Sequence, residues 1–195
     1  MDGLKRVCVY CASSTKVDSA YYREAETLGR ILAENRITTV YGGGSVGLMG
    51  ALADSVLKNR GQIIGVIPGF MTELEWEHKR LTELIKVKDM HERKKKLILD
   101  TDAVIALPGG TGTLEELSEA ITMKRLGFYF KPIIIVNSKG FYTPLIKMLE
   151  RMAEENFLRS EHLKMWTLTD STQEIMKAIE MSHAWDQDAR KFAAI

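Results

Sequence analysis

Short apolar runs alternate along this chain with longer amphipathic runs, and this alternation restricts the fold more than any other feature of the sequence. Alternating strands and helices form βαβ units around a parallel sheet. The apolar runs are continuous rather than alternating, which is typical of strands buried on both faces. Predicted strands cover 6–11, 37–41, 62–67, 102–107, 132–137 and 165–169. Predicted helices cover 21–36, 48–59 (ended by Gly61), 90–100, 113–127, 141–155 and 172–182.

We therefore expect an α/β fold, a Rossmann-like three-layer sandwich with a mostly parallel sheet covered by helices on both faces. A length of 195 residues and a hydrophobic content of 45% suit one globular unit, so residues 1–195 are expected to form a single nucleotide-binding domain. The irregular, polar segment 69–84 is expected to be a lid or an active-site loop.

Charge and hydropathy exclude several classes of partner. A net charge of +1 does not suit a nucleic-acid binder, which normally carries a clustered basic excess. The basic run at 92–96 is short and reads as a solvated helix face. The first residues lack a long apolar stretch, and no window offers about 18 unbroken apolar residues for a membrane span. We expect no membrane partner and a cytoplasmic location.

Two glycine clusters follow predicted strands and lead directly into predicted helices, at 42–50 and 109–112. Ligands of open α/β sheets bind at the carboxyl ends of the strands. A helix N-terminus there offers free N–H groups and the positive end of the helix dipole to an anion. We expect the two clusters to lie at neighbouring strand ends and to hold a phosphate between them, with Gly43 and Gly44 shaping one wall.

The first cluster fits G-x-G-x-x-G, through Gly42, Gly44 and Gly47. A dinucleotide site also needs an acidic residue at the end of the next strand, and here that strand ends in "GVIPGF". A Walker A loop needs a lysine after its glycines, and none follows. A phosphate cradle and a plain tight turn are the two interpretations that remain.

The second cluster, "LPGGTGTLEE" at 107–116, leaves two interpretations of Glu116 open. Thr113 and Glu116 have the spacing of a capping box, which would make Glu116 structural. The three glycines before the cap exceed what a turn needs, and a carboxylate beside a phosphate is electrostatically costly unless it performs chemistry. Arg93 and Lys94, in "MHERK", are either a surface pair or phosphate ligands.

No metal or redox centre is expected. Cys8 and Cys11 have C-x-x-C spacing, but they lie in a predicted strand, where residues three apart point to opposite faces. Zinc would need a second pair of ligands. The histidines show no ligand spacing; they are His78, His91, His162 and His183.

Together, "YGGGSVGLMG", "MHERK" and "PGGTGTLEE" resemble the Lonely Guy family of cytokinin riboside 5′-monophosphate phosphoribohydrolases, over roughly residues 5–160. Members were often labelled possible lysine decarboxylases, but the chain offers no pyridoxal-phosphate lysine context. The resemblance implies hydrolysis of the N-glycosidic bond of an adenosine 5′-monophosphate, N6-modified or not, with no cofactor. It also implies a homodimer or a higher homo-oligomer, with the site near the subunit interface.

The resemblance assigns roles residue by residue. Arg93 and Glu116 match the catalytic positions of the family. The positions that match its substrate-binding residues are Glu75, Arg93, Lys94, Gly110, Thr111, Gly112, Thr113, Leu114, Glu115, Glu116 and Thr122. The chain departs from the family after Thr122, where Met123, Lys124 and Arg125 replace a Trp-Ala-Gln-like run. These three residues bear on the base pocket or the oligomer contact.

The expected mechanism follows from the charge that develops on the sugar. Cleaving a ribosyl–base bond builds positive charge on the ring, which carboxylates stabilise in glycoside chemistry. We expect Glu116 to be ionised, without a strongly raised pKa, and to orient the attacking water. Arg93 would position the nucleotide or assist departure of the base. The alternative is a non-catalytic nucleotide or molybdenum-cofactor carrier on the same fold, in which Glu116 caps a helix and Arg93 anchors phosphate.

Overall fold

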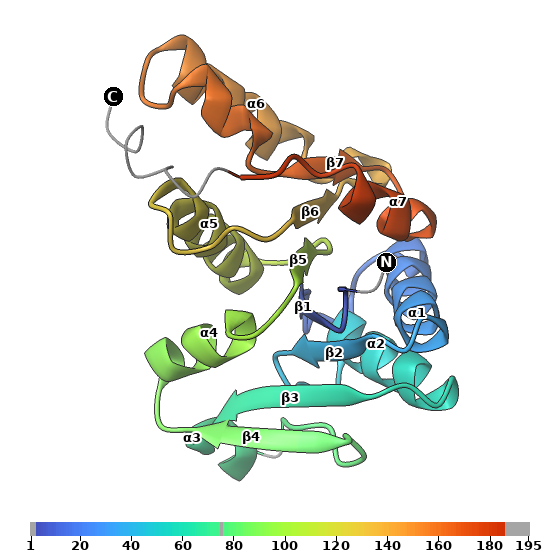
Figure 1. The fold of residues 1–195 in the computed structure, drawn as a ribbon. Helices are drawn as coiled ribbons and strands as arrows, with labels where there is room; N and C mark the ends of the chain where they lie inside the picture. The colour runs from blue at the N-terminus through green and yellow to red at the C-terminus, as the bar shows by residue number, and fades with distance from the viewer. Residues whose placement is uncertain (1–2, 75, 186–195) are drawn as a thin grey trace.

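The computed structural model of the chain describes residues 3–74 and 76–185, and a single sheet runs through it (Figure 1). Its seven strands lie in the order β4-β3-β2-β1-β5-β6-β7. Every pair of neighbouring strands is parallel, which confirms the predicted α/β fold. The strands are β1 (Arg6–Tyr10), β2 (Thr38–Tyr41), β3 (Ile63–Pro68), β4 (Glu83–Val87), β5 (Ala103–Ala106), β6 (Ile133–Val136) and β7 (Thr167–Thr169).

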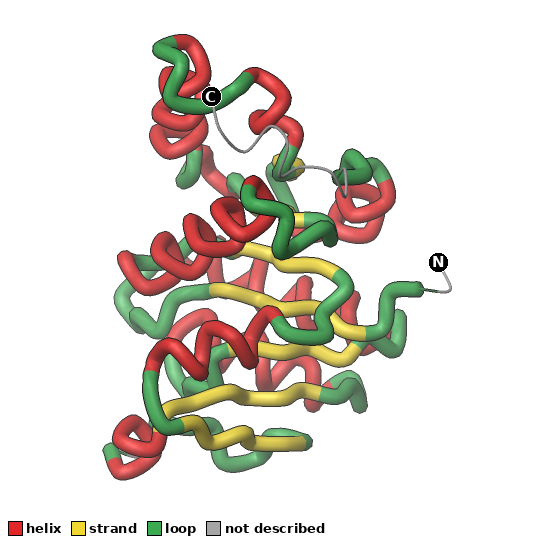
Figure 2. The backbone as a smooth tube through the Cα atoms, turned by 60° about the vertical axis from the view of Figure 1, so that its left-hand side comes forward, coloured by secondary structure: helices red, strands yellow, loops and turns green. Residues whose placement is uncertain are grey.

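Helices cover both faces of this sheet, as the sequence predicts (Figure 2). One hydrophobic core packs the sheet against α1 (Ser19–Glu34), α2 (Gly47–Lys58) and α7 (Ile175–Glu180). The other packs it against α4 (Met90–Ile98), α5 (Thr111–Arg125) and α6 (Thr143–Glu154). The remaining helices are short: α3 (Gly69–Glu73) and the 3₁₀ turns Ser138–Gly140, Ser160–Lys164 and Thr172–Glu174.

The central strand β1 shows why the apolar runs are continuous. Val7 and Val9 belong to the first core, whereas Cys8 and Tyr10 belong to the second, and all four are at most 4% exposed. Cys11 lies in the first core, opposite to Cys8. Because the two cysteines belong to cores on opposite faces of the sheet, the prediction that they point to opposite faces is confirmed. Both are free and buried.

The order of strands reverses between β1 and β5, which lie side by side at the centre of the sheet. The helix that follows β1 packs on one face and the helix that follows β5 packs on the other. Such a reversal leaves a crevice at the carboxyl ends of the two strands. The two glycine clusters follow β2 and β5, so β1 lies between them, and the prediction of neighbouring strand ends is wrong by one strand.

The segment 69–84, predicted to be a lid or loop, is more ordered than expected. It begins with α3, and its last residues enter β4, an edge strand that pairs with β3 and that the sequence did not reveal. The loop between them is fastened to the first glycine cluster, because Ser45 N–H donates to Trp76 O (3.0 Å) and His78 N–H to Gly43 O (2.8 Å).

Candidate functional site

A cavity of about 270 Å³ lies in the crevice at the switch point. The loop after β1, one residue of α2, one residue of α4 and the first turns of α5 line it. The lining residues are Cys11, Ala12, Ser13, Ser14, Met49, Arg93, Gly110, Thr111, Gly112, Thr113 and Glu116. Four predicted binding residues of the second glycine cluster and both predicted catalytic residues therefore meet in one cavity.

The wall of this cavity is the N-terminus of α5. Gly110 is the N-cap residue, and no side chain caps the helix. The first amides of α5, on Thr111, Gly112 and Thr113, have no helical acceptor, because a helix leaves its first N–H groups unpaired. Together with the positive end of the helix dipole, they form an anion site. Since α5 begins at Thr111, Thr113 and Glu116 lie inside the helix, and the capping-box interpretation is wrong.

The glycines at this helix start have different reasons to be there. A Cβ on Gly109 would lie 2.1 Å from Thr113 Oγ1, so the fold itself requires glycine at this position. A Cβ on Gly110 or Gly112 would meet nothing within 4 Å. Packing therefore does not demand glycine at Gly110 and Gly112. Their bare backbone leaves room for the close approach of a ligand from the cavity.

At the base of the cavity, Arg93 and Glu116 form a buried ion pair. Arg93 Nη1 lies 3.1 Å from Glu116 Oε1, and each residue is only 7% exposed. Arg93 Nε also donates to Val66 O (3.1 Å), and Nη2 donates to Gly42 O (3.3 Å). The interpretation of Arg93 as a surface residue is thus wrong, since its charge is held inside the protein by three acceptors.

Burial also sets the protonation of Glu116. Desolvation raises the pKa of this carboxyl to about 7, although the positive charge of Arg93 opposes the increase. The expectation that its pKa would not be strongly raised is therefore wrong. The reason is that the ion pair is shielded from water, and burial disfavours the charged carboxylate more than Arg93 favours it. A carboxyl with this pKa exchanges its proton near neutral pH, as general acids and bases do.

Other residues assigned by the resemblance lie outside the cavity. Lys94 Nζ pairs with Glu115 Oε1 (2.7 Å) and Glu119 Oε2 (3.3 Å) on the outer side of α5. Leu114 is 40% exposed and does not line the cavity. Thr122 lines a separate hollow between α5 and α6.

The first glycine cluster supports the site from behind. Gly43 has a φ of +80°, and a Cβ there would lie 3.3 Å from Ile67 Cβ. Gly44 forms an isolated bridge with Glu77. Neither glycine lines the cavity. Glu75 lies outside the described residues.

The run after Thr122 does not reach the cavity either. Lys124 is 1% exposed, and its Nζ donates to Lys131 O (2.8 Å). Desolvation lowers the pKa of Lys124 to about 8. Met123 lines a hollow between α4 and the loop after α5. Lys124 therefore fastens the loop after α5 to the helix, and its side chain does not line the cavity.

Sequence reasoning missed the loop after β1. Ala12, Ser13 and Ser14 line the cavity, and Met49 N–H donates to Ala12 O (3.1 Å). The signal available in the sequence was only positional: the loop follows the first predicted strand, and ligands of open α/β sheets bind at the carboxyl ends of the strands. Two adjacent serines add hydroxyl donors to the wall opposite α5.

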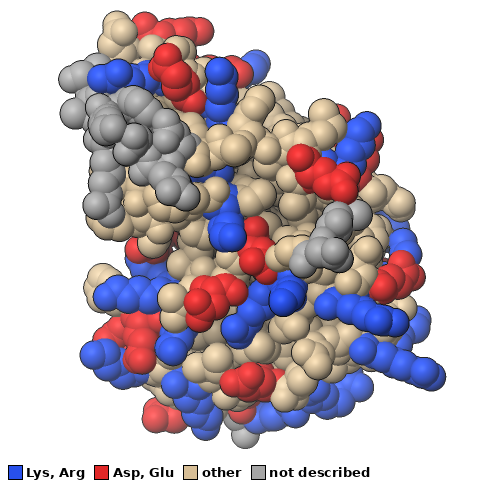
Figure 3. Space-filling model, viewed as in Figure 1, with Lys and Arg blue, Asp and Glu red and all other residues tan. Residues whose placement is uncertain are grey.

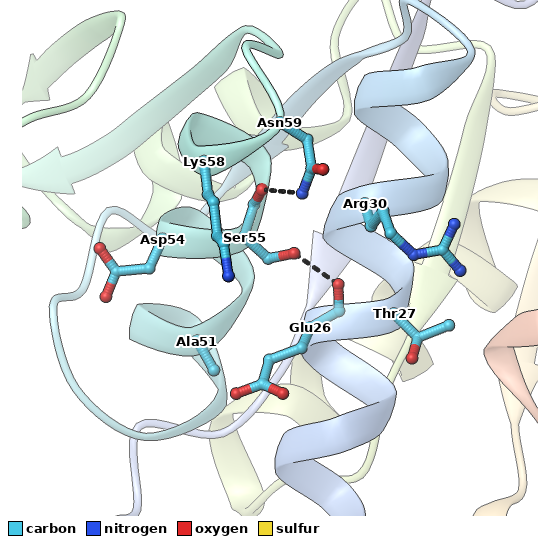
Figure 4. A pocket seen from close by; sticks show the side chains of 8 residues that line it. All are labelled: Glu26, Thr27, Arg30, Ala51, Asp54, Ser55, Lys58 and Asn59. Atoms are coloured by element: carbon cyan, nitrogen blue, oxygen red, sulfur yellow. Dashed lines mark hydrogen bonds between the residues drawn. The ribbon is translucent and has the colours of Figure 1, made fainter.

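A second groove lacks this combination of burial and charge. A larger groove of about 490 Å³ lies between α1 and α2 (Figure 4). Ser55 Oγ donates there to the main-chain oxygen of Glu26, and none of the polar side chains that line the groove is buried. Acidic and basic side chains are interspersed on the face shown in Figure 3.

Among residues 3–74 and 76–185, no three His, Cys, Asp or Glu side chains gather as a possible metal site. None of the helices in that part of the chain has the length and apolarity needed to cross a bilayer.

Comparison with known proteins gives a consistent picture. A family model described as "Possible lysine decarboxylase" matches residues 49–179. The chain is 40% identical to the probable cytokinin riboside 5′-monophosphate phosphoribohydrolase LOGL2 of Oryza sativa subsp. japonica, covering 90% of this chain and 72% of the relative. It is 39% identical to the cytokinin riboside 5′-monophosphate phosphoribohydrolase LOG7 of Arabidopsis thaliana, covering 90% and 81%.

Solved structures share the fold at lower identity. The molybdenum cofactor carrier protein of Chlamydomonas reinhardtii superposes with a TM-score of 0.70 at 18% identity, over 91% of this chain and 96% of that one. The molybdenum cofactor binding protein of Rippkaea orientalis gives a TM-score of 0.68 at 21% identity, with the same coverage. These likenesses concern the Rossmann-like fold alone.

Proposed function

Because this chain belongs to the Lonely Guy family of cytokinin riboside 5′-monophosphate phosphoribohydrolases, we propose that it hydrolyses the N-glycosidic bond of adenosine 5′-monophosphates, N6-modified or not. The products are the free base and ribose 5-phosphate. One observation carries the proposal: a buried Arg93–Glu116 pair lies at the base of a cavity whose wall is an uncapped helix N-terminus. Such a cavity suits a molecule with a phosphate at one end and a bond to be cleaved nearby.

In this proposal the phosphate binds at the start of α5. The amides of Thr111, Gly112 and Thr113 donate to its oxygens, and the bare Gly110 and Gly112 let it approach. The serine hydroxyls of the loop after β1 face the same space from the other side. The sugar then extends toward Glu116, one helical turn further along α5.

The chemistry is assigned to the ion pair. Water attacks C1′ while the C1′–N9 bond breaks, the bonding electrons leave with the base, and the proton that water gives up passes by way of Glu116 to the base. Ionised Glu116 stabilises the positive charge on the ring and accepts a proton from water. Arg93 uses three of its five N–H groups in the bonds described, so two can serve the departing base.

The first test concerns Glu116. Glu116→Gln keeps the shape of the side chain and removes its charge, so we expect release of adenine from adenosine 5′-monophosphate to fall by about 10³-fold or more. The measurement is adenine formation, followed by chromatography, with the exposed Glu150→Gln on α6 as control. Near-normal turnover by Glu116→Gln would reject the assigned role.

The second test concerns the phosphate. Adenosine lacks the group that binds at α5, so we expect kcat/KM for adenosine to lie about 10²-fold or more below that for its monophosphate. Equal values for the two substrates would remove the phosphate site from the proposal. A chain that binds the nucleotide and releases no base would instead be a carrier, the function named for its structural neighbours.

We further propose that the protein works as a homo-oligomer, with a dimer as the basic unit, in the cytoplasm. An apolar hollow supports the first statement: Leu99, Phe128 and Phe130 are exposed around it, between α4 and the loop after α5. The free thiols of Cys8 and Cys11 suit a reducing compartment. Light scattering and cell fractionation test the two statements.

A further inference from the structure

The position of the Arg93 guanidinium is set by three elements that meet behind the cavity. Its Nε donates to Val66 O in β3, its Nη2 to Gly42 O after β2, and its Nη1 to Glu116 in α5. A guanidinium is planar, and its donors point in fixed directions. Two main-chain carbonyls therefore define its plane and turn the third donor toward the carboxylate.

Gly42 contributes more to this arrangement than its carbonyl. A Cβ on Gly42 would lie 2.3 Å from Arg93 Nη2 and 3.0 Å from Met49 Cε. Real Cβ atoms do not come so close, so any side chain at position 42 displaces the guanidinium. Gly42 is not among the residues with positive φ, whereas Gly43 beside it has a φ of +80°. Glycine is thus required at position 42 for space and at position 43 for backbone conformation.

We propose that Gly42 is a positioning residue of the reaction, which acts by leaving the space in which Arg93 reaches Glu116. This inference rests on the function proposed above for the pair. It predicts that an added methyl group at position 42 moves Arg93 Nη1 away from the carboxylate. The loss should appear in the chemical step more than in phosphate binding, because the phosphate site lies on α5.

The charge environment of Glu116 provides a readout that a general packing defect would not reproduce. Arg93 and Lys94 face it from α4, and Glu115 and Glu119 lie on its own helix. Cys8, Tyr10 and Cys11 approach from β1 and the residue after it. Among these groups, Arg93 is the main influence that lowers the pKa of Glu116. Displacing the guanidinium therefore raises that pKa further.

The experiment compares Gly42→Ala with the wild type. We expect kcat for adenosine 5′-monophosphate to fall roughly 10- to 100-fold with KM changed less than about threefold, as a displacement near 1 Å does. The ¹³C NMR titration of the Glu116 carboxyl, assigned by its absence in Glu116→Gln, should move to higher pH. Gly69→Ala is the control, since a Cβ there meets nothing within 4 Å. Wild-type kcat and carboxyl titration in Gly42→Ala would overturn the inference.

A double variant separates positioning from misfolding. Arg93→Ala removes the atom that the new methyl group would overlap, so Gly42→Ala should cost little stability or activity in that background. If the single variant fails to fold, the double variant should fold as well as Arg93→Ala alone. Additive losses would contradict the inference. A wild type that releases no base would sink the proposed function, whereas the carboxyl titration and the stability cycle would still test the role of Gly42.

Discussion

At the scale of the residue, the decisive property is the proton on Glu116. A carboxyl with a pKa of about 7 is partly protonated in the neutral range, whereas an exposed glutamate has a pKa near 4.5. The proposed mechanism uses the ionised form. The activity of the protein is therefore expected to follow the loss of this proton.

The expected pH profile has a definite direction. We predict that kcat for adenosine 5′-monophosphate rises as the pH passes upward through about 7, because the carboxylate form of Glu116 increases there. The measurement is initial rates of base release between pH 5 and 9. A rate that is highest below pH 6 would show that the protonated carboxyl is the active form.

The free energy of unfolding should also depend on the protonation of Glu116, but it should fall with rising pH, whereas the activity rises. The folded chain keeps a proton that the unfolded chain releases between pH 4.5 and about 7, so the free energy of unfolding falls as pH rises through this window. We predict that Glu116→Gln loses this dependence and gains up to roughly 3 kcal/mol relative to the wild type between pH 4.5 and 7. Urea unfolding at both pH values measures the difference. Parallel pH dependences in the two proteins would mean that Glu116 titrates normally.

At the scale of the element, the start of α5 allows its structural and ligand-binding glycines to be separated. We predict that Gly112→Ala leaves the free energy of unfolding unchanged or raises it by about 1 kcal/mol, since alanine favours a helix and meets no neighbour. The same variant should bind nucleotide more weakly. Gly109→Ala should instead destabilise the fold, through its overlap with Thr113. Chemical unfolding and calorimetric titration measure both, and unchanged nucleotide affinity in Gly112→Ala would argue against a phosphate at this helix.

The ends of helices show where sequence reasoning succeeds and where it stops. The end of α5 at Gly127 was predicted, and Gly127 has the left-handed φ of +69° expected of such a cap. The end of α2 was assigned to Gly61, but Arg60 takes the left-handed position, with a φ of 59°. Position 61 requires glycine for a different reason, because a Cβ there would lie 2.6 Å from Ala33 Cβ in α1. A glycine required by tertiary packing is indistinguishable, in sequence, from one required by its own backbone.

The same limit applies to the strands and the site. Strands buried on both faces were found because their apolar runs are unbroken. The edge strand β4, "ELIKV", was missed because its apolar run is interrupted by Lys86, which is exposed like Glu83. Sequence motifs identified Arg93 and Glu116 as candidates. The contacts that bury this pair join residues that are 23 to 51 positions apart in the sequence, and no local pattern contains them. The same contacts determine the raised pKa of Glu116 and the part played by Gly42.

At the scale of the whole molecule, we propose that the chain unfolds as one domain. The two hydrophobic cores lie on opposite faces of one sheet, and strands such as β1 contribute side chains to both. We predict a single urea transition, with coincident tryptophan fluorescence and far-ultraviolet circular dichroism. Trp166 lies in the second core, whereas the circular dichroism reports on helices of both. Two separated transitions would show that the halves of the sheet unfold independently.

The chain order of the sheet has one more consequence. The connection through α4 leaves β4 at the outer edge of the sheet and enters β5 at its centre. It therefore crosses over β3, β2 and β1, and Arg93 lies in this crossover connection. Its partner Glu116 comes from α5, the first helix after that crossover connection. The two residues belong to different halves of the polypeptide and become neighbours only after the crossover connection has packed on the sheet. During synthesis on the ribosome, the Arg93–Glu116 pair therefore cannot form until α5 has emerged.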